Sequence, residues 1–201
     1  MRSAFNKVRT EKVVFVGAPS TGKTSITGKF AHNTAPTHTD PTVGASFVSR
    51  TIKVDETDVK LDIWDTGGSE KYRALAPMYY RDARGAFVVV DCTRKETLEE
   101  AKSWVDELMS KGNPGIIMVL VVNKIDLTDK REVSDDHIKE FQYENQFSFV
   151  QETSAMTGAG INELFEKMGR ELLKLPPVED SVDSVDLLVT NPQEQESSCS
   201  C

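Results

Sequence analysis

The segment at residues 17–24, Gly-Ala-Pro-Ser-Thr-Gly-Lys-Thr, constrains the fold of this chain more than any other and is called the phosphate loop below. It matches the pattern G-x-x-x-x-G-K-[ST], in which a glycine-rich loop joins a strand to a helix and surrounds a phosphate with backbone N–H groups. The required context is present, because residues 12–16 are typical of a strand and residues 23–31 of a helix. A glycine turn capped by a helix is the alternative, but the bare pattern arises by chance in about one chain in a hundred of this length. The predicted contacts to the ligand are Pro19, Ser20, Thr21, Gly22, Lys23, Thr24 and Ser25.

Short apolar runs rich in β-branched residues alternate along the chain with longer amphipathic stretches. This order predicts an α/β fold, in which helices cross over between the strands of a mostly parallel sheet. The apolar runs at residues 87–91 and 116–122 are typical of central strands covered on both faces. A hairpin is also predicted, with strands at residues 46–54 and 59–64 and its turn at residues 55–58. Two helices are predicted at residues 98–108 and 161–168.

Charge is unevenly distributed along the 201 residues. The formal net charge is −8, yet residues 176–201 hold six acidic residues and no Lys or Arg, so the preceding part is nearly neutral. Nucleic-acid binding requires a concentrated basic surface, and nucleic acid is therefore not an expected partner. No apolar run is long enough to span a bilayer, and the three cysteines do not form a disulfide framework. We expect a flexible N-terminus at residues 1–10, one domain at residues 11–175 and a disordered acidic tail at residues 176–201.

A second motif indicates which base accompanies the phosphates. Asn123-Lys124-Ile125-Asp126 directly follows an apolar run, which places it at the carboxyl end of a strand, where ligands of open α/β sheets bind. The Asp126 carboxylate can accept hydrogen bonds from N1–H and the exocyclic amine of guanine, a donor pair that adenine lacks. Asn123 would fix the loop, and the stem of Lys124 would cover one face of the base. A polar turn is the alternative for an isolated tetrapeptide, but the position of this one after the phosphate loop favours guanine.

With Asp-Ile-Trp-Asp-Thr-Gly-Gly at residues 62–68 added, residues 11–175 resemble the Ras-like small GTPases, and among them the Rab family of vesicle-traffic regulators. Rab-like segments lie at residues 43–47, 60–65, 72–73, 79–83 and 90–93, and Cys-Ser-Cys stands at residues 199–201. The resemblance implies a P-loop NTPase fold with a six-stranded, mostly parallel sheet flanked by helices. It also implies a GTP hydrolase that binds GTP or GDP with Mg²⁺ and recruits effectors when GTP is bound. An ATP kinase is disfavoured because such an enzyme has no use for the guanine motif.

The resemblance also implies roles for individual residues. Thr24, Thr42 and Asp65 would hold Mg²⁺, the last of them through water. Thr42 would also reach the γ-phosphate, the Gly68 N–H would sense it, and losing these contacts on hydrolysis would release the switch loops. The implied catalytic residues are Lys23, Gly68 and Ser69. Ser154, Ala155 and Met156 would form the third guanine-contact loop. Phe47, Trp64 and Tyr79 would form an aromatic surface that effectors recognise.

Four residues depart from the family pattern. Ser69 replaces the glutamine that orients the attacking water, and serine is too short to span that distance, so we expect slow intrinsic hydrolysis. Pro19 replaces a glycine close to the γ-phosphate and removes one N–H. Ala35 replaces the aromatic residue that packs against guanine, so either His32 or His38 substitutes for it or nucleotide leaves faster. Met156 replaces a lysine, and its flexible stem can still cover the base.

The Cys-x-Cys sequence at residues 199–201 does not fit the C-a-a-X pattern of single-chain prenylation. The resemblance to Rab proteins implies that Cys199 and Cys201 both carry geranylgeranyl groups. Two lipids anchor a protein stably, so we expect the protein on the cytoplasmic face of endomembranes or vesicles, with a cytosolic pool. We also expect it to be a monomer. The implied partners are a guanine-nucleotide exchange factor, a GTPase-activating protein, effectors, a Rab escort protein and a GDP dissociation inhibitor. Ser69 and Pro19 keep one rival open, which is a GTP-locked or non-cycling scaffold without significant hydrolysis.

Overall fold

The computed structural model describes residues 8–34, 41–68, 73 and 76–177, and its described strands form one six-stranded sheet in the order β2-β3-β1-β4-β5-β6. The strands are β1 (Arg9–Val16), β2 (Ala45–Val54), β3 (Thr57–Thr66), β4 (Gly85–Asp91), β5 (Ile117–Asn123) and β6 (Phe149–Glu152). Only β2 is antiparallel to its neighbour among these strands. The predicted fold class, an α/β sheet of mostly parallel strands, is confirmed.

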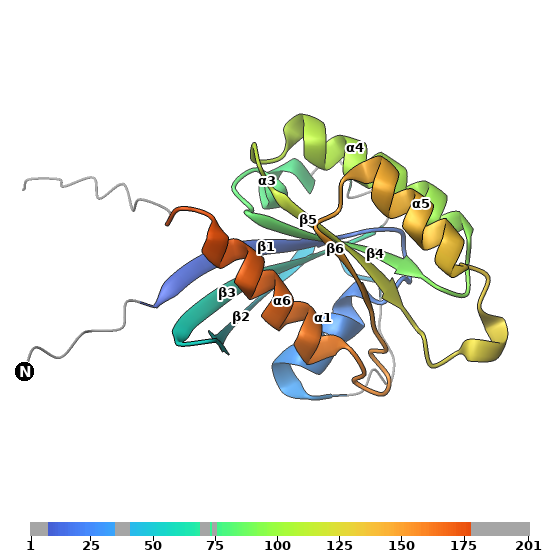
Figure 1. The fold of residues 1–201 in the computed structure, drawn as a ribbon, viewed down its shortest axis with the longest axis horizontal. Helices are drawn as coiled ribbons and strands as arrows, with labels where there is room; N and C mark the ends of the chain where they lie inside the picture. The colour runs from blue at the N-terminus through green and yellow to red at the C-terminus, as the bar shows by residue number, and fades with distance from the viewer. Residues whose placement is uncertain (1–7, 35–40, 69–72, 74–75, 178–201) are drawn as a thin grey trace, which may run out of the picture.

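Helices cover both faces of the sheet (Figure 1). The helices α1 (Lys23–His32) and α6 (Ile161–Lys174) pack on one face. The opposite face carries α3 (Ala76–Tyr80), α4 (Glu96–Lys111) and α5 (Asp135–Asn145), and a short 3-10 turn, η1 (Thr128–Lys130), follows β5. None of the helices in the described ranges is long and apolar enough to cross a membrane.

The central strands separate two hydrophobic cores. All residues of β4 and β5 are buried, as predicted for strands covered on both faces. Successive side chains point to opposite faces, so Val88 packs toward α4 whereas Phe87 packs toward α6. In the second core the ring of Phe165 from α6 lies 5.3 Å from that of Phe87 and 3.6 Å from that of Phe30. The sheet is therefore held from both sides by helices.

The hairpin is tighter than predicted. Val54 pairs with Thr57, so the turn consists of Asp55 and Glu56 alone, and Asp55 adopts a left-handed φ of 52°. Residues 57 and 58, which the sequence analysis placed in the turn, belong to β3. Neither α5 nor β6 was predicted from the sequence, because α5 is largely polar and β6 is only four residues long.

The parallel strands β1, β3, β4 and β5 end at one edge of the sheet, and the motifs follow them there. The phosphate loop follows β1 and leads into α1, which begins at Lys23 as predicted. Asp65 lies near the end of β3, and Asn123 is the last residue of β5. The register pairs Asp91 with Asn123 at the ends of β4 and β5. Loops at this edge are where open α/β sheets bind ligands.

Candidate nucleotide-binding site

The phosphate loop folds back on the side chain of Lys23. The Lys23 ammonium donates hydrogen bonds to the carbonyl oxygens of Gly17 at 2.9 Å and Ala18 at 2.8 Å. The Thr21 hydroxyl donates to the same Ala18 oxygen at 3.0 Å. These bonds turn loop carbonyls toward the protein. Because the C=O and N–H of a trans peptide point in opposite directions, the following N–H groups face the other way.

Lys23 brings a buried positive charge to the loop, and its side chain is almost fully enclosed, with 5% of the residue exposed. Burial lowers the pKa of Lys23 to about 8, although the nearby Asp65 carboxylate partly opposes that shift. An anion bound in the loop would favour the charged ammonium and raise this pKa. The site is therefore electrostatically prepared for a phosphate group.

Oxygen ligands gather beside the loop at Asp65. One carboxylate oxygen, Oδ2, accepts hydrogen bonds from the hydroxyls of Thr24 at 2.6 Å and Ser46 at 3.4 Å. The Thr24 hydroxyl also lies 2.9 Å from that of Thr42. The other carboxylate oxygen, Oδ1, is buried and has no hydrogen-bond partner among the described residues. Burial raises the pKa of Asp65, since the charged carboxylate loses water.

This oxygen cluster fits the Mg²⁺ that the sequence predicts. Mg²⁺ prefers oxygen ligands and keeps several waters, so a threonine hydroxyl, a second hydroxyl and a carboxylate through water suit it. The unpartnered Oδ1 of Asp65 supplies an acceptor for such a water, and a cation would offset the cost of burying the charge. Thr24, Thr42 and Asp65, the three predicted metal residues, lie together.

A cleft of about 340 Å³ opens in front of the loop. It is lined by Pro19, Ser20, Gly22, Lys23, Thr24, Ser25, Pro41, Thr42, Thr66, Gly68 and Lys124. Gly68 packs so closely on the phosphate loop that a Cβ there would lie 2.6 Å from the Lys23 nitrogen and 2.7 Å from the Gly17 oxygen. Only glycine allows the backbone after β3 to approach the loop in this way.

Asn123 connects the phosphate loop to the loop after β6. Its side-chain nitrogen donates to the Thr21 oxygen at 2.9 Å. Its side-chain oxygen accepts from the Thr153 hydroxyl at 3.2 Å and from the Ala155 N–H at 3.3 Å. The buried amide thus connects three segments, namely the end of β5, the phosphate loop and the loop after β6.

The remaining predicted guanine contacts lie around that amide. The Ser154 hydroxyl donates to Asp126 at 2.5 Å, which brings the second and third predicted loops together. Met156 is exposed, with 54% of its surface accessible. Lys124 has a left-handed φ of 68° and lines the cleft, but its ammonium pairs with Asp91 at 2.6 Å. Thr21, Asn123, Asp126, Ser154, Ala155 and Met156 do not line the cleft itself.

The predicted aromatic surface forms a contiguous row. The rings of Phe47 and Trp64 are 5.2 Å apart, and those of Trp64 and Tyr79 are 5.4 Å apart. Phe47 is half-exposed, whereas Trp64 and Tyr79 are partly buried and pack against the core beneath α4. The predicted positions Ala35, His38, Ser69, Cys199 and Cys201 lie outside the described residues.

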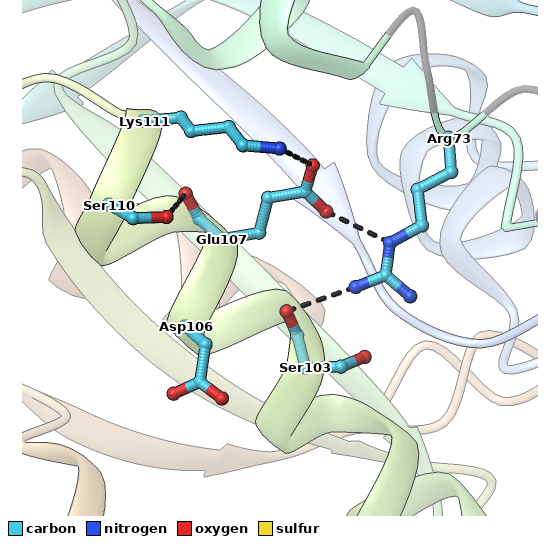
Figure 2. A pocket seen from close by; sticks show the side chains of 6 residues that line it. All are labelled: Arg73, Ser103, Asp106, Glu107, Ser110 and Lys111. Atoms are coloured by element: carbon cyan, nitrogen blue, oxygen red, sulfur yellow. Dashed lines mark hydrogen bonds and ion pairs between the residues drawn. The ribbon is translucent and has the colours of Figure 1, made fainter.

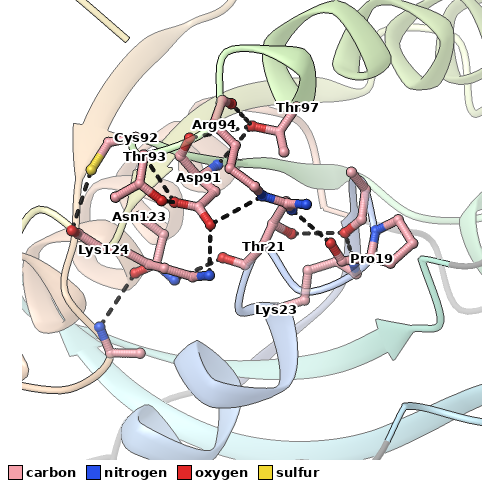
Figure 3. A network of polar contacts seen from close by, with 12 residues as sticks. Pro19, Thr21, Lys23, Asp91, Cys92, Thr93, Arg94, Thr97, Asn123 and Lys124 are labelled. Carbon is pink, nitrogen blue, oxygen red and sulfur yellow. Dashed lines mark hydrogen bonds and ion pairs between the residues drawn. The ribbon is translucent and has the colours of Figure 1, made fainter. Parts of the chain in front are cut away.

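Asp91 and Arg94, which were not among the predicted site residues, connect the phosphate loop to the guanine motif (Figure 3). Arg94 donates from Nη2 to the Pro19 oxygen at 2.9 Å and lies 3.4 Å from Asp91 through Nε. Asp91 also accepts from the N–H and hydroxyl of Thr93. Burial alone would raise the pKa of Asp91, but the bonds from Lys124 and Thr93 outweigh it and hold that pKa below its usual value. The sequence signals for Asp91 were its position at the end of a predicted strand and its place in the Rab-like segment at residues 90–93, whereas Arg94 lay in none of the motifs.

Comparison with known proteins shows the family of this chain. The model of the Ras family matches residues 12–174. The chain is 40% identical to Ras-related protein RABF2b of Arabidopsis thaliana over 185 residues, which is 92% of each chain. It is 39% identical to Ras-related protein Rab5A of Oryza sativa subsp. japonica, covering 98% of this chain and 96% of the relative. Ras-related protein Rab-5A of Dictyostelium discoideum is 40% identical over 85% of each chain. The chain belongs to the Rab family of Ras-like small GTPases, which are GTP-binding switches of vesicle traffic.

Proposed function

We propose that this Rab-family protein is a slowly hydrolysing GTP/GDP switch that recruits effectors in vesicle transport from a membrane-anchored position. The observation that carries the proposal is the packing of Gly68 on Lys23 and the phosphate loop. Gly68 lies beside the Lys23 ammonium, to which we assign the outer phosphates, and the next residue in the sequence is Ser69. Because serine lacks the reach of a glutamine amide, the attacking water is poorly oriented and hydrolysis is slow.

The proposed roles follow from the positions of the side chains. Thr24, Thr42 and Asp65 hold Mg²⁺, which when bound neutralises charge on the outer phosphates. Lys23 contributes its ammonium to the same phosphates, and Gly68 offers its N–H to the γ-phosphate. Asp126 recognises guanine on a loop that Asn123 and Ser154 fix. Thr42 and Gly68 are therefore the points at which loss of the γ-phosphate releases the switch loops.

Single-turnover GTP hydrolysis tests this proposal. Ser69→Gln should raise the rate at least about tenfold, because it restores an amide that can orient the water. Ser69→Ala is the matched control, since it removes the hydroxyl without adding an amide, and its rate should equal that of the wild type. If the wild type shows no hydrolysis even with an activating protein, and Ser69→Gln does not raise the rate, the rival scaffold without hydrolysis is supported instead.

The membrane anchor is proposed from Cys199 and Cys201, each carrying a geranylgeranyl group. The tail is acidic and repels anionic lipid, so the lipids and protein partners provide the targeting. The proposed location is the cytoplasmic face of endomembranes or vesicles, and the relatives named Rab5 favour endosomal membranes among them. Fractionation of cells that express a Cys199→Ser/Cys201→Ser variant tests the anchor. The variant should be entirely cytosolic, and a membrane-bound variant would contradict the proposal.

A further inference from the structure

Four carbonyl groups of the phosphate loop accept hydrogen bonds from side chains of the protein. Lys23 holds those of Gly17 and Ala18, and Asn123 holds that of Thr21. The Pro19 carbonyl is held by Arg94, which comes from the turn between β4 and α4. Arg94 differs from the other two because it belongs to none of the motifs identified in the sequence. Its contact lies at the exposed tip of the loop, where Pro19 and Ser20 line the cleft.

The tip needs an external support for two reasons. Pro19 has no N–H of its own to anchor it. Ser20 adopts a left-handed φ of 62°, which costs a residue other than glycine about 1 kcal/mol or more. The Pro19–Ser20 peptide unit, like any other, has one carbonyl and one N–H with which to fix its orientation. Arg94 binds the carbonyl at 2.9 Å.

Orientation of this peptide unit decides where the Ser20 N–H points. No cis peptide bond occurs among the described residues, so the Pro19 carbonyl and the Ser20 N–H point in opposite directions. Arg94 does not line the cleft, whereas Ser20 does. When Arg94 draws the carbonyl toward α4, the N–H of Ser20 turns away from Arg94 and toward the cleft.

Arg94 can support the tip because its own position is fixed. Its Nε lies 3.4 Å from the Asp91 carboxylate, and its backbone N–H donates to the Asp91 carbonyl at 3.0 Å. The Asp91 backbone N–H in turn donates to the Thr97 hydroxyl in the first turn of α4 at 3.0 Å. Lys124, on the guanine motif, pairs with the same carboxylate oxygen as Arg94 (Figure 3). Asp91 therefore joins the tip of the phosphate loop to the base-recognition loop.

We propose that Arg94 is a positioning residue for nucleotide binding: it holds the Pro19 carbonyl so that the Ser20 N–H donates to the β-phosphate, and thereby slows nucleotide release. This inference rests on guanine-nucleotide binding alone and requires neither hydrolysis nor lipidation. A guanidinium suits the task because its planar fork can serve a carbonyl and a carboxylate at once.

Release of a fluorescent GDP analogue, measured in excess unlabelled GDP and Mg²⁺, tests the proposal. Arg94→Ala should release GDP three to ten times faster, and tenfold corresponds to about 1.4 kcal/mol. Arg94→Lys should also release GDP faster than the wild type, because one ammonium cannot reproduce the two-sided contact. Lys95→Ala is the matched control, since it removes a neighbouring positive charge from the same turn, and its release rate should not change.

Two readouts separate positioning of the phosphate from a general loss of structure. In competition experiments, Arg94→Ala should weaken GDP but leave the affinity for GMP, which lacks the β-phosphate, within twofold of wild type. In ³¹P NMR of the GDP-loaded protein, the β-phosphate resonance should move while the α-phosphate resonance stays. Equal weakening of GMP and GDP, or an unchanged GDP release rate, would overturn the proposal. A wild-type chain that bound no GDP would overturn the nucleotide-binding assignment as well.

Discussion

Gly22, directly before α1, is the residue at which the backbone of the phosphate loop depends most on the absence of a side chain. Its φ is 98°, and a Cβ would lie 2.2 Å from the Asn123 side-chain nitrogen. That amide holds the Thr21 carbonyl and accepts from the loop after β6. Gly22→Ala should therefore displace Asn123 and weaken GDP binding at least about tenfold, because the left-handed strain of about 1–2 kcal/mol adds to the clash. Titration with a fluorescent GDP analogue measures the effect.

Gly28→Ala provides the matched control for that substitution. Gly28 lies within α1, and the nearest atom to a Cβ there is the Thr34 hydroxyl, at an ordinary contact distance of 3.9 Å. Alanine in the interior of a helix is more stable than glycine by about 0.5–1 kcal/mol. Gly28→Ala should thus bind GDP like the wild type and melt slightly higher. Equal GDP affinity in the two variants would contradict the role assigned to Gly22.

At the scale of the elements, α4 is fixed to its neighbours through Glu107 (Figure 2). The Glu107 carboxylate accepts from Arg73 at 2.9 Å, from the Tyr80 hydroxyl at 3.0 Å and from Lys111 at 3.1 Å. Arg73 also donates to the Ser103 carbonyl at 3.0 Å, and its guanidinium lies over the Trp104 ring. These contacts join α3 and Arg73 to α4.

The Glu107 contacts predict an acid-sensitive contribution to stability. Burial opposes ionisation, but the bonds from Arg73, Lys111 and Tyr80 outweigh it and hold the pKa of Glu107 below its ordinary value of 4.5. A carboxylate with a lowered pKa in the folded state stabilises the protein above the unfolded pKa and loses that contribution as pH falls through the folded pKa. Below about pH 4.5, the free energy of unfolding should therefore fall more steeply in the wild type than in Glu107→Gln. Urea unfolding across this pH range measures the effect, and exposed Glu99→Gln is the control. Parallel curves of unfolding free energy against pH for the wild type and Glu107→Gln would contradict the prediction.

The elements also show what the sequence could and could not reveal. The strands β4 and β5 and the phosphate loop were predicted because continuous apolar runs and a fixed motif are local signals. The helix α5 was missed because it buries only Ile138 and Phe141 among its 11 residues, which leaves little periodicity to detect. The Arg94 contact to Pro19 joins residues 75 positions apart, and a pairing of that kind follows from the packing of the sheet rather than from a local pattern.

For the molecule as a whole, a buried charge cluster joins the start of the chain to the end of the last helix. Glu11 of β1 is 1% exposed and pairs through Oε1 with both Arg9 and Arg84. Arg9 also donates to the Leu172 carbonyl at 2.6 Å, and Arg84 donates to the Pro176 carbonyl at 2.6 Å. The cluster thus closes the amino edge of the sheet against the carboxyl end of α6, the edge opposite the phosphate loop.

Removing the central carboxylate should destabilise the fold without affecting the nucleotide. Glu11→Ala leaves two enclosed guanidinium groups facing one another, and breaking a buried ion pair from one side costs about 3 kcal/mol. Arg84→Ala should cost less, because Arg9 continues to pair with Glu11. Both losses are measured by urea unfolding at one fixed GDP concentration, since bound ligand adds to the apparent stability.

The GDP release rate is the companion measurement for the Glu11→Ala and Arg84→Ala variants. Residues 12–16 of β1 separate Glu11 from the phosphate loop, and at about 3.3 Å per residue the strand from Glu11 to Gly17 spans about 20 Å. Release should therefore stay within twofold of the wild type in both variants, in contrast to Arg94→Ala. A Glu11→Ala variant that was as stable as the wild type, or one that released GDP several times faster, would show that the two edges of the sheet are not independent.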